Sequence, residues 1–135
     1  MRTETLTIRT GSTPVVRDIT EECERFAAGA GGDGLLHVFV PHATAGLAIL
    51  ETGAGSEADL LTALDGLLPT DAPWRHRHGS RGHGRDHLLP ALVAPYAIVP
   101  VLGGRLGLGT WQRICVVDTN VDNSTRTVRL SFLTG

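Results

Sequence analysis

Residues 35–50 read Leu-Leu-His-Val-Phe-Val-Pro-His-Ala-Thr-Ala-Gly-Leu-Ala-Ile-Leu, which is two apolar runs on either side of a Pro-His step. The first run, 35–40, is apolar except for His37, and this pattern predicts a buried strand. Pro41 ends that strand, because proline lacks the amide hydrogen that a sheet requires. Strand character resumes over 44–50, so the stretch predicts two successive strands with a short connection.

The segments around this stretch predict a mixed fold. Residues 3–10 alternate between apolar side chains and threonine, which is typical of a half-buried strand. Residues 18–29 combine a capping-box-like start with apolar residues at helical spacing, and they predict an amphipathic helix. A leucine-rich helix is expected over 56–69. The first half therefore contains both helices and strands.

The second half predicts further strands joined by tight turns. We expect strands over 96–101, 105–118 and 126–133, a hairpin turn at the glycines 103–104, and a short helix within 86–94. The whole chain then has roughly six or seven strands and two main helices, with mostly hairpin-like connections. This pattern predicts an α+β fold, mostly antiparallel and β-sandwich-like, rather than a parallel doubly wound sheet.

Length and composition restrict the class of protein. A chain of 135 residues forms one compact domain, 1–135, and is too short for two. Its net charge of −2 lacks the positive excess that attracts polyphosphate backbones, so we expect no nucleic-acid partner. All 12 basic residues are arginine, which excludes Schiff-base chemistry and a P-loop lysine. Nothing in the sequence predicts a nucleotide cofactor.

Cysteine usage and hydropathy indicate the compartment. Cys23 and Cys115 lie far apart among apolar neighbours without a Cys-x-x-Cys motif, so we expect two buried, reduced thiols. The first residues contain no apolar leader, and no apolar run approaches the ~18 residues of a membrane span. We therefore expect a cytoplasmic protein with no membrane partner.

The polar segment 70–86 and the residue after it hold four of the six histidines. They are His76, His78, His83 and His87. Their spacing matches no standard zinc motif, but three neutral imidazoles that converge make an open site for a divalent transition metal. The alternative is a solvated, partly disordered loop rich in histidine and arginine.

Two polar residues flank the strand expected over 44–50. His42 is followed by small residues, Thr44 among them, that would let a ligand approach the backbone; the alternative role for His42 is a structural hydrogen bond. Glu51 ends the apolar strand, where burial of a carboxylate is costly unless it is paired, so it is a candidate acid or base. The alternative for Glu51 is a surface carboxylate. His37 is interpreted as a core or partner-facing residue.

Four further side chains are candidates for binding an anion or a ring. Arg126 suits bidentate contact with a phosphate, and Arg129 lies on the opposite face of the same expected strand, so at most one of them faces a given site. Trp111 and Gln112 follow glycines that indicate a bulge or the close approach of another group. Structural packing is the simpler interpretation of the indole.

Four ordered motifs resemble the YjbQ family of small bacterial and archaeal proteins, which is described as secondary thiamine-phosphate synthase-like. Residues 42–51 are similar to the family's H-T-[ST]-A-x-L-x-I-N-E. The other motifs are Ala-Pro-Trp-Arg-His at 72–76, His-Leu at 87–88, similar to A-H-L, and Gly-Thr-Trp-Gln at 109–112. Their order and spacing agree across 35–133.

The resemblance implies a compact, jelly-roll-like α+β subunit that assembles as a homotrimer. It also implies that His42, His76 and His87 form one site, which holds a divalent metal such as zinc or magnesium or orients a phosphate. His78 and His83 are then secondary candidates.

The sequence departs from the family's pattern close to this site. Leu50 replaces an asparagine, Arg81 and His83 stand where the family has aspartate and asparagine, and Asp86 replaces the alanine of A-H-L. Arginine in place of aspartate reverses the sign of a charge, which bears on activity rather than on the fold.

The activity implied by the resemblance is transfer of a pyrimidine-methyl group from its diphosphate to a thiazole phosphate, as the main or a side activity. His42 and Glu51 would act in catalysis on this small phosphorylated metabolite. The substrate or its phosphates would contact Arg81, His83, Arg85, Arg126, Thr44, Trp111 and Gln112. The alternatives are a non-catalytic trimeric module that binds a metal or an anionic metabolite, and a hydrolase that uses a metal-bound water.

Overall fold

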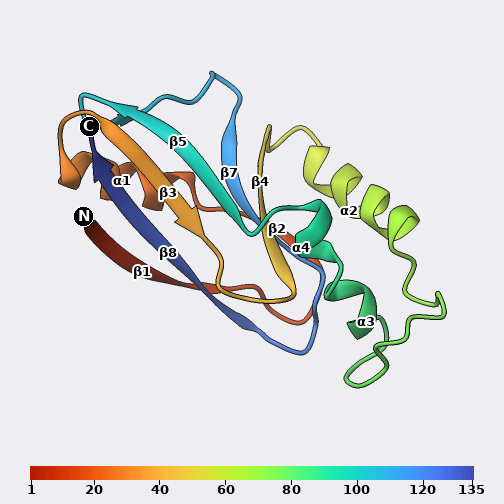
Figure 1. Cartoon of the computed structure of the whole chain (residues 1–135). Coiled ribbons are helices and arrows are strands. Elements are labelled where there is room, and N and C mark those ends of the chain that lie inside the picture. Colours follow the sequence, from red (N-terminus) through yellow and green to blue (C-terminus); the bar gives the residue numbers. More distant parts are fainter.

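The structure, a computed structural model, describes all residues from 1 to 135 as two antiparallel sheets with helices at both ends (Figure 1). The larger sheet has the strand order β1-β8-β3-β5-β6, and the smaller sheet has the order β2-β7-β4. All strand pairs are antiparallel, which confirms the expected sheet type. The strands are β1 Arg2–Arg9, β2 Val15–Asp18, β3 Gly34–Phe39, β4 Ala45–Leu50, β5 Tyr96–Leu102, β6 Arg105–Leu106, β7 Arg113–Asp118 and β8 Thr125–Thr134.

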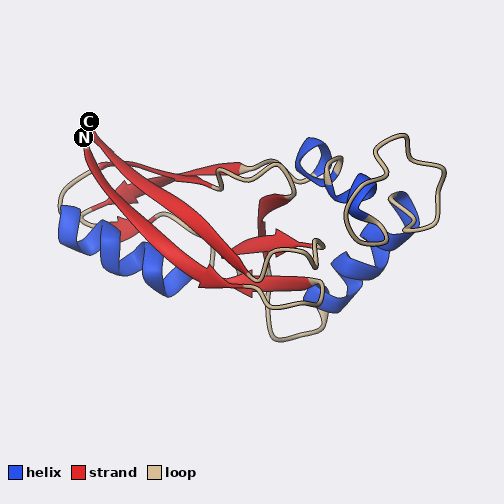
Figure 2. Cartoon of the chain, turned by 90° about the horizontal axis from the view of Figure 1, so that it is seen from below, coloured by secondary structure: helices blue, strands red, loops and turns tan.

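The helices lie in two groups at opposite ends of the molecule (Figure 2). Helix α1, Thr20–Ala30, packs against the end of the larger sheet where both chain termini lie. Helices α2 (Ser56–Leu67), α3 (His83–Asp86) and α4 (Leu89–Leu92) gather at the other end. Helices α1 and α2 confirm the two main helices expected from periodicity. None of the helices is long and apolar enough to cross a bilayer.

The main core lies between the two sheets and α1. Alternate side chains of the central strands point inward, as the period of two requires, and they are almost fully removed from water. On strands β3 and β8 these residues are Leu36, Val38, Val128, Leu130 and Phe132. A second, smaller core of Leu64, Leu68, Leu89 and Val117 fastens α2 and α4 to β7. It anchors both ends of the histidine-rich segment.

The two cysteines are buried and unpaired, as expected for small apolar side chains. Burial raises the pKa of both Cys23 and Cys115 to about 12. Both thiols are therefore protonated at physiological pH, which is the unreactive form of cysteine.

The structure differs from the expected elements in two regions. Strand β2 falls where only a turn and a helix start were expected, and Asp18 is its last residue rather than the helix cap. Asp18 still accepts hydrogen bonds from the backbone nitrogen (2.9 Å) and the hydroxyl (2.6 Å) of Thr20. The single strand expected over 105–118 is split into β6 and β7, because residues 107–112 form a turn.

Candidate functional site

The histidine-rich segment is an ordered loop followed by the short helix α3. The indole nitrogen of Trp74 donates to the carbonyl of Pro69 (2.8 Å), and Nε of Arg77 donates to the carbonyl of Trp74 (3.0 Å). Gly84 lets the loop lie directly on α3, because a Cβ at this position would stand 2.3 Å from the carbonyl oxygen of His76. The loop therefore contacts α3 through its own backbone.

This packing brings four imidazole rings together. The ring centroid of His76 is 4.1 Å from that of His78, 4.3 Å from that of His87 and 5.3 Å from that of His83. The Nε2 atoms of His83 and His87 are 3.0 Å apart. Ligand nitrogens of His76, His83 and His87 all lie within 4.8 Å of one another, close enough to share a metal ion. In the structure these three histidines therefore converge on one point.

The loop between β7 and β8 contacts the histidine cluster through Asp122. The carboxylate oxygen Oδ2 of Asp122 lies 2.7 Å from Nδ1 of His83 and accepts hydrogen bonds from the hydroxyl (2.9 Å) and backbone nitrogen (3.3 Å) of Ser80. These hydrogen bonds, that from the Ser80 hydroxyl above all, lower the pKa of the Asp122 carboxyl. Asp122 is therefore ionised and acts only as an acceptor.

A buried polar network supports this loop. The side chain of Asp86 accepts hydrogen bonds from Oγ1 of Thr119 (2.6 Å) and Nδ2 of Asn120 (3.1 Å). Oδ1 of Asn120 in turn accepts from the backbone nitrogen of Asp122 (3.0 Å). Burial raises the pKa of Asp86, while these hydrogen bonds oppose that effect. The network fixes α3 and the β7–β8 loop relative to each other.

Electrostatics keep two of the clustered imidazoles neutral. Desolvation, followed by the like charges of the neighbouring rings, lowers the pKa of His76. The same two causes lower the pKa of His87, with Asp86 opposing them weakly. Neutral imidazole is the form that binds a metal ion.

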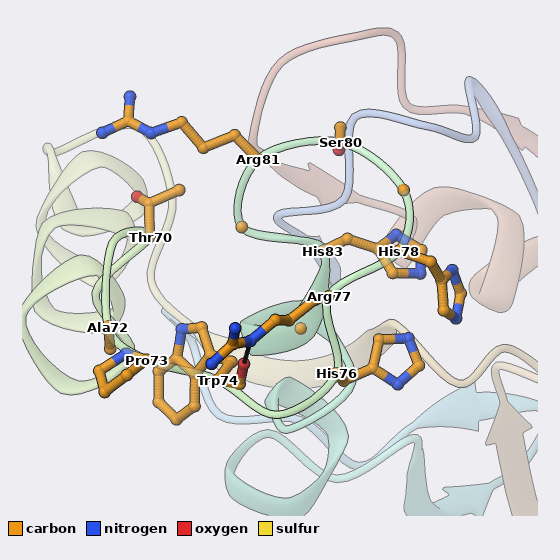
Figure 3. A pocket seen from close by; sticks show the side chains of 13 residues that line it. Thr70, Ala72, Pro73, Trp74, His76, Arg77, His78, Ser80, Arg81 and His83 are labelled. Carbon is orange, nitrogen blue, oxygen red and sulfur yellow. Dashed lines mark hydrogen bonds between the residues drawn. The ribbon is translucent and has the colours of Figure 1, made fainter.

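A polar cavity of about 320 Å³ lies along the same loop, between Thr70, Trp74 and residues 76–84. Figure 3 shows the rings of His76, His78 and His83 on one side of the loop, with Arg77 extending toward Trp74 on the other. None of the 13 lining residues is acidic. The loop therefore presents imidazoles on one side and arginine on the other.

His42 does not join this cluster. Its Nε2 atom accepts a hydrogen bond from the backbone nitrogen of Thr127 (2.9 Å) and lies 3.1 Å from the hydroxyl of Thr127. Desolvation, followed by the charge of Arg126, lowers the pKa of His42. A neutral ring that accepts at Nε2 carries its proton on Nδ1, so no lone pair is left for a metal. The structure gives His42 the structural role that was its alternative.

The buried arginines are bound to internal acceptors rather than exposed to a phosphate. Arg126, 2% exposed, donates to Asp118 (2.6 and 3.1 Å) and to the hydroxyl of Thr44 (2.9 Å). Arg85 donates to the carboxylate of Asp65 and to a backbone carbonyl. The expectation that Arg85, Arg126 and Thr44 bind phosphate is therefore replaced by a structural role for each.

Glu51, Trp111 and Gln112 lie at the far end of β4 from the histidines. Leu50 pairs with Arg113 while Ala45 pairs with Asp118, so Glu51 is separated from the Asp118 end by the length of the strand, ~17–20 Å. Glu51 is exposed, and Trp111 is 71% exposed. Oε1 of Gln112 accepts from the backbone nitrogen of Gly109 (2.7 Å) and closes a turn. Within one subunit these residues form no site with the cluster.

Arg81 remains at the loop surface. Its Nε donates to Asp71 (2.7 Å), and this hydrogen bond raises the pKa of Arg81 and lowers that of Asp71. Asp122 and Asn120 were not among the residues predicted from the sequence. A signal was present, because 119–123, which is polar except for Val121, directly follows the buried strand β7.

Comparison with known proteins identifies the family. The family model described as UPF0047 protein YjbQ-like matches residues 4–135. The UPF0047 protein Rv2556c of Mycobacterium tuberculosis is 56% identical over all 135 residues, covering 100% of both chains. A UPF0047 protein of Archaeoglobus fulgidus is 34% identical and covers 91% of this chain and 95% of its own.

Solved structures agree with this assignment. The hypothetical protein APE1520 from Aeropyrum pernix K1 superposes with a TM-score of 0.91 at 34% sequence identity, covering 100% of both chains. A YbjQ-like protein of unknown function from Sulfolobus solfataricus P2 has the same fold, with a TM-score of 0.92 at 24% identity over 99% of this chain and 97% of that one. The sequence motifs, the fold and the relatives agree: the chain belongs to the YjbQ-like UPF0047 family.

Proposed function

We propose that this protein binds a divalent metal ion at the clustered histidines and uses it to handle a small phosphorylated molecule. The observation that carries this proposal is the convergence of three imidazole nitrogens within 4.8 Å of one another. A metal ion at this point would neutralise phosphate charge, and its bound water or phosphate ligand would face solvent.

Arginines of the same loop supply the second part of the proposal. Arg77 lines the cavity, and Arg81 is held only by an exposed ion pair with Asp71, which contributes little to stability. Arg81 can therefore exchange Asp71 for a phosphate, for which its planar guanidinium is suited. Metal and arginine together are suited to stabilise a departing pyrophosphate.

The reaction we propose is the one implied by the resemblance. The pyrimidine-methyl carbon leaves its diphosphate and forms a bond to the ring nitrogen of a thiazole phosphate, giving thiamine phosphate and pyrophosphate. Both electrons of the broken carbon–oxygen bond go to the pyrophosphate. Its accumulating negative charge is what the metal ion and the arginines would stabilise.

One observation favours a second candidate, a non-catalytic module that binds a metal or an anionic metabolite, over the metal-dependent hydrolase. The cavity lining contains no acidic residue, and Asp122 is already bound to Ser80 and His83. The cluster therefore has no free carboxylate to serve as an acid or base. The substitution reaction above needs none, whereas hydrolysis needs an activated water.

An assay with the two phosphorylated substrates separates the candidates. We expect release of pyrophosphate and thiamine phosphate by the metal-loaded protein, with a KM at least tenfold higher in Arg77→Gln and Arg81→Gln. Arg25→Gln, an exposed site on α1 at the other end of the molecule, is the matched control and should behave like the parent. Pyrophosphate binding without any turnover would support the module, and a protein that binds neither a divalent metal nor pyrophosphate would contradict both candidates.

We also propose that the subunits assemble as a homotrimer through the outer face of the larger sheet. That face carries exposed apolar side chains next to a hollow of about 460 Å³ that is lined mainly by apolar residues. They include Leu35, Tyr96, Ile98 and Leu133. Apolar side chains that adjoin on one surface are typical of a protein–protein contact.

A further inference from the structure

We propose that His76, His83 and His87, with His78 as an exchangeable fourth ligand, form a centre for a divalent transition ion of the zinc class rather than for magnesium. The inference rests on the proposed function, because it specifies the metal that this function uses. His83 occupies a position where the family's pattern has asparagine. The proposed ligands therefore differ from His42, His76 and His87, which the resemblance implied.

The orientation of His83 is set by its contact with the loop between β7 and β8. Its Nδ1 atom lies 2.7 Å from the carboxylate oxygen Oδ2 of Asp122. The other ring nitrogen, Nε2, faces the Nε2 atom of His87. A carboxylate that binds the outer nitrogen of a histidine is the arrangement found behind many metal ligands.

The separation of the donor atoms also suits a shared metal ion. Nε2 of His83 is 3.0 Å from Nε2 of His87. Two nitrogens bound tetrahedrally to zinc, each at ~2.0–2.1 Å, stand roughly 3.3 Å apart. The pair therefore needs to move by only a few tenths of an ångström to share an ion, and His76 supplies the third nitrogen.

His78 lies where an exchangeable fourth ligand would be expected. Its ring centroid is 4.1 Å from that of His76 and 4.9 Å from that of His83, but 6.5 Å from that of His87. His78 is exposed and lies on the loop rather than on α3. It can complete a tetrahedron of four imidazoles and can also swing away, so we assign it the position that a phosphate oxygen would take.

The donor chemistry decides the class of metal. Imidazole nitrogens suit zinc, cobalt, nickel or copper, whereas magnesium requires oxygen ligands and retains much of its water. No carboxylate oxygen belongs to the group of converging ligand atoms. His42 is excluded from the set because Thr127 already donates to its Nε2.

Zinc titration of the tag-free protein against a chromophoric chelator tests the inference. We expect one zinc per chain, which a large excess of magnesium does not displace. His83→Asn should weaken zinc binding at least a hundredfold, and Asp122→Asn should weaken it ~10–100-fold, because its carboxylate no longer orients the ring of His83. His78→Ala should retain one zinc per chain with a smaller loss of affinity.

Two histidines serve as matched controls. His37→Ala, on β3, and His42→Gln should leave zinc affinity unchanged. Unchanged affinity in both His83→Asn and Asp122→Asn, or a loss in His42→Gln as large as in His83→Asn, would overturn the inference. Circular dichroism checks that each variant is folded, and His87→Gln replaces His83→Asn if the latter does not fold.

The outcomes also separate this inference from the proposed function. Zinc binding that follows the expected pattern, in a protein that neither binds pyrophosphate nor turns over the substrates, overturns the function alone. Turnover that depends on magnesium, persists without zinc and is unchanged in His83→Asn overturns the assignment of zinc to this centre and leaves the reaction standing.

Discussion

The pair Arg126–Asp118 is the most consequential polar contact at the residue scale, because both side chains are almost fully buried, at 2% and 1% exposure. Arg126→Ala leaves the Asp118 carboxylate without its charge partner, and we expect a loss of ~3–5 kcal/mol in the free energy of unfolding. Arg25→Ala, at an exposed site on α1, should change it by less than ~0.5 kcal/mol. Urea denaturation measures both, and equal effects would contradict this role for Arg126.

The lowered pKa of His42 predicts that the free energy of unfolding depends on pH. Burial and Arg126 lower its pKa in the folded protein, so the folded state binds fewer protons than the unfolded state. The stability that neutral His42 provides is full above the ordinary histidine pKa of ~6.5 and is lost as the pH falls through the lower folded value. His42→Gln still offers an acceptor to Thr127 but does not titrate. We expect denaturation curves between pH 7 and pH 5 to show a smaller loss of stability in this variant than in the parent.

At the scale of elements, the contact between the histidine loop and α3 depends on Gly84. A methyl group there would meet the carbonyl oxygen of His76 at 2.3 Å, so Gly84→Ala must push the loop away from α3. We expect a loss of ~1–3 kcal/mol in the free energy of unfolding, together with weaker zinc binding.

Gly66→Ala is the matched control for this prediction. Gly66 lies within α2, and a Cβ there meets nothing within 4 Å, so this variant should gain ~0.5–1 kcal/mol from helix propensity. Thermal unfolding compares the Tm of the parent with those of Gly84→Ala and Gly66→Ala. A Gly84→Ala protein as stable as Gly66→Ala would show that the loop does not rest on α3.

Local patterns predicted most elements but only part of the site. Alternation and helical spacing are local properties, so β3, β4, α1 and α2 follow from the sequence. The four residues of β2 were missed because they carry too few positions to show a period. The hydrogen bond from Ser80 to Asp122 joins residues 42 positions apart, and only the docking of the β7–β8 loop creates it. The family resemblance placed His42 among the ligands, whereas its hydrogen bond to Thr127 spans 85 positions and leaves no sign in the local sequence.

At the scale of the whole molecule, the proposed homotrimer assembles through the outer face of the larger sheet. We expect light scattering to give the mass of a trimer for the parent protein. Ile98→Asp, on the exposed face of β5, should shift the mass toward the monomer because it places a charge in an apolar contact.

Leu67→Asp on α2 is the control, because it changes an equally apolar exposed residue away from that sheet. Its mass should match that of the parent. A monomeric parent, or an unchanged mass for Ile98→Asp, would contradict the proposed interface.

The most direct test of the central claim is a crystal structure with anomalous diffraction recorded at the zinc edge from protein grown with zinc. We expect one anomalous peak per chain, ~2.0–2.1 Å from nitrogens of His76, His83 and His87. A peak at His42 instead, or none at the cluster while zinc is bound elsewhere, would contradict it.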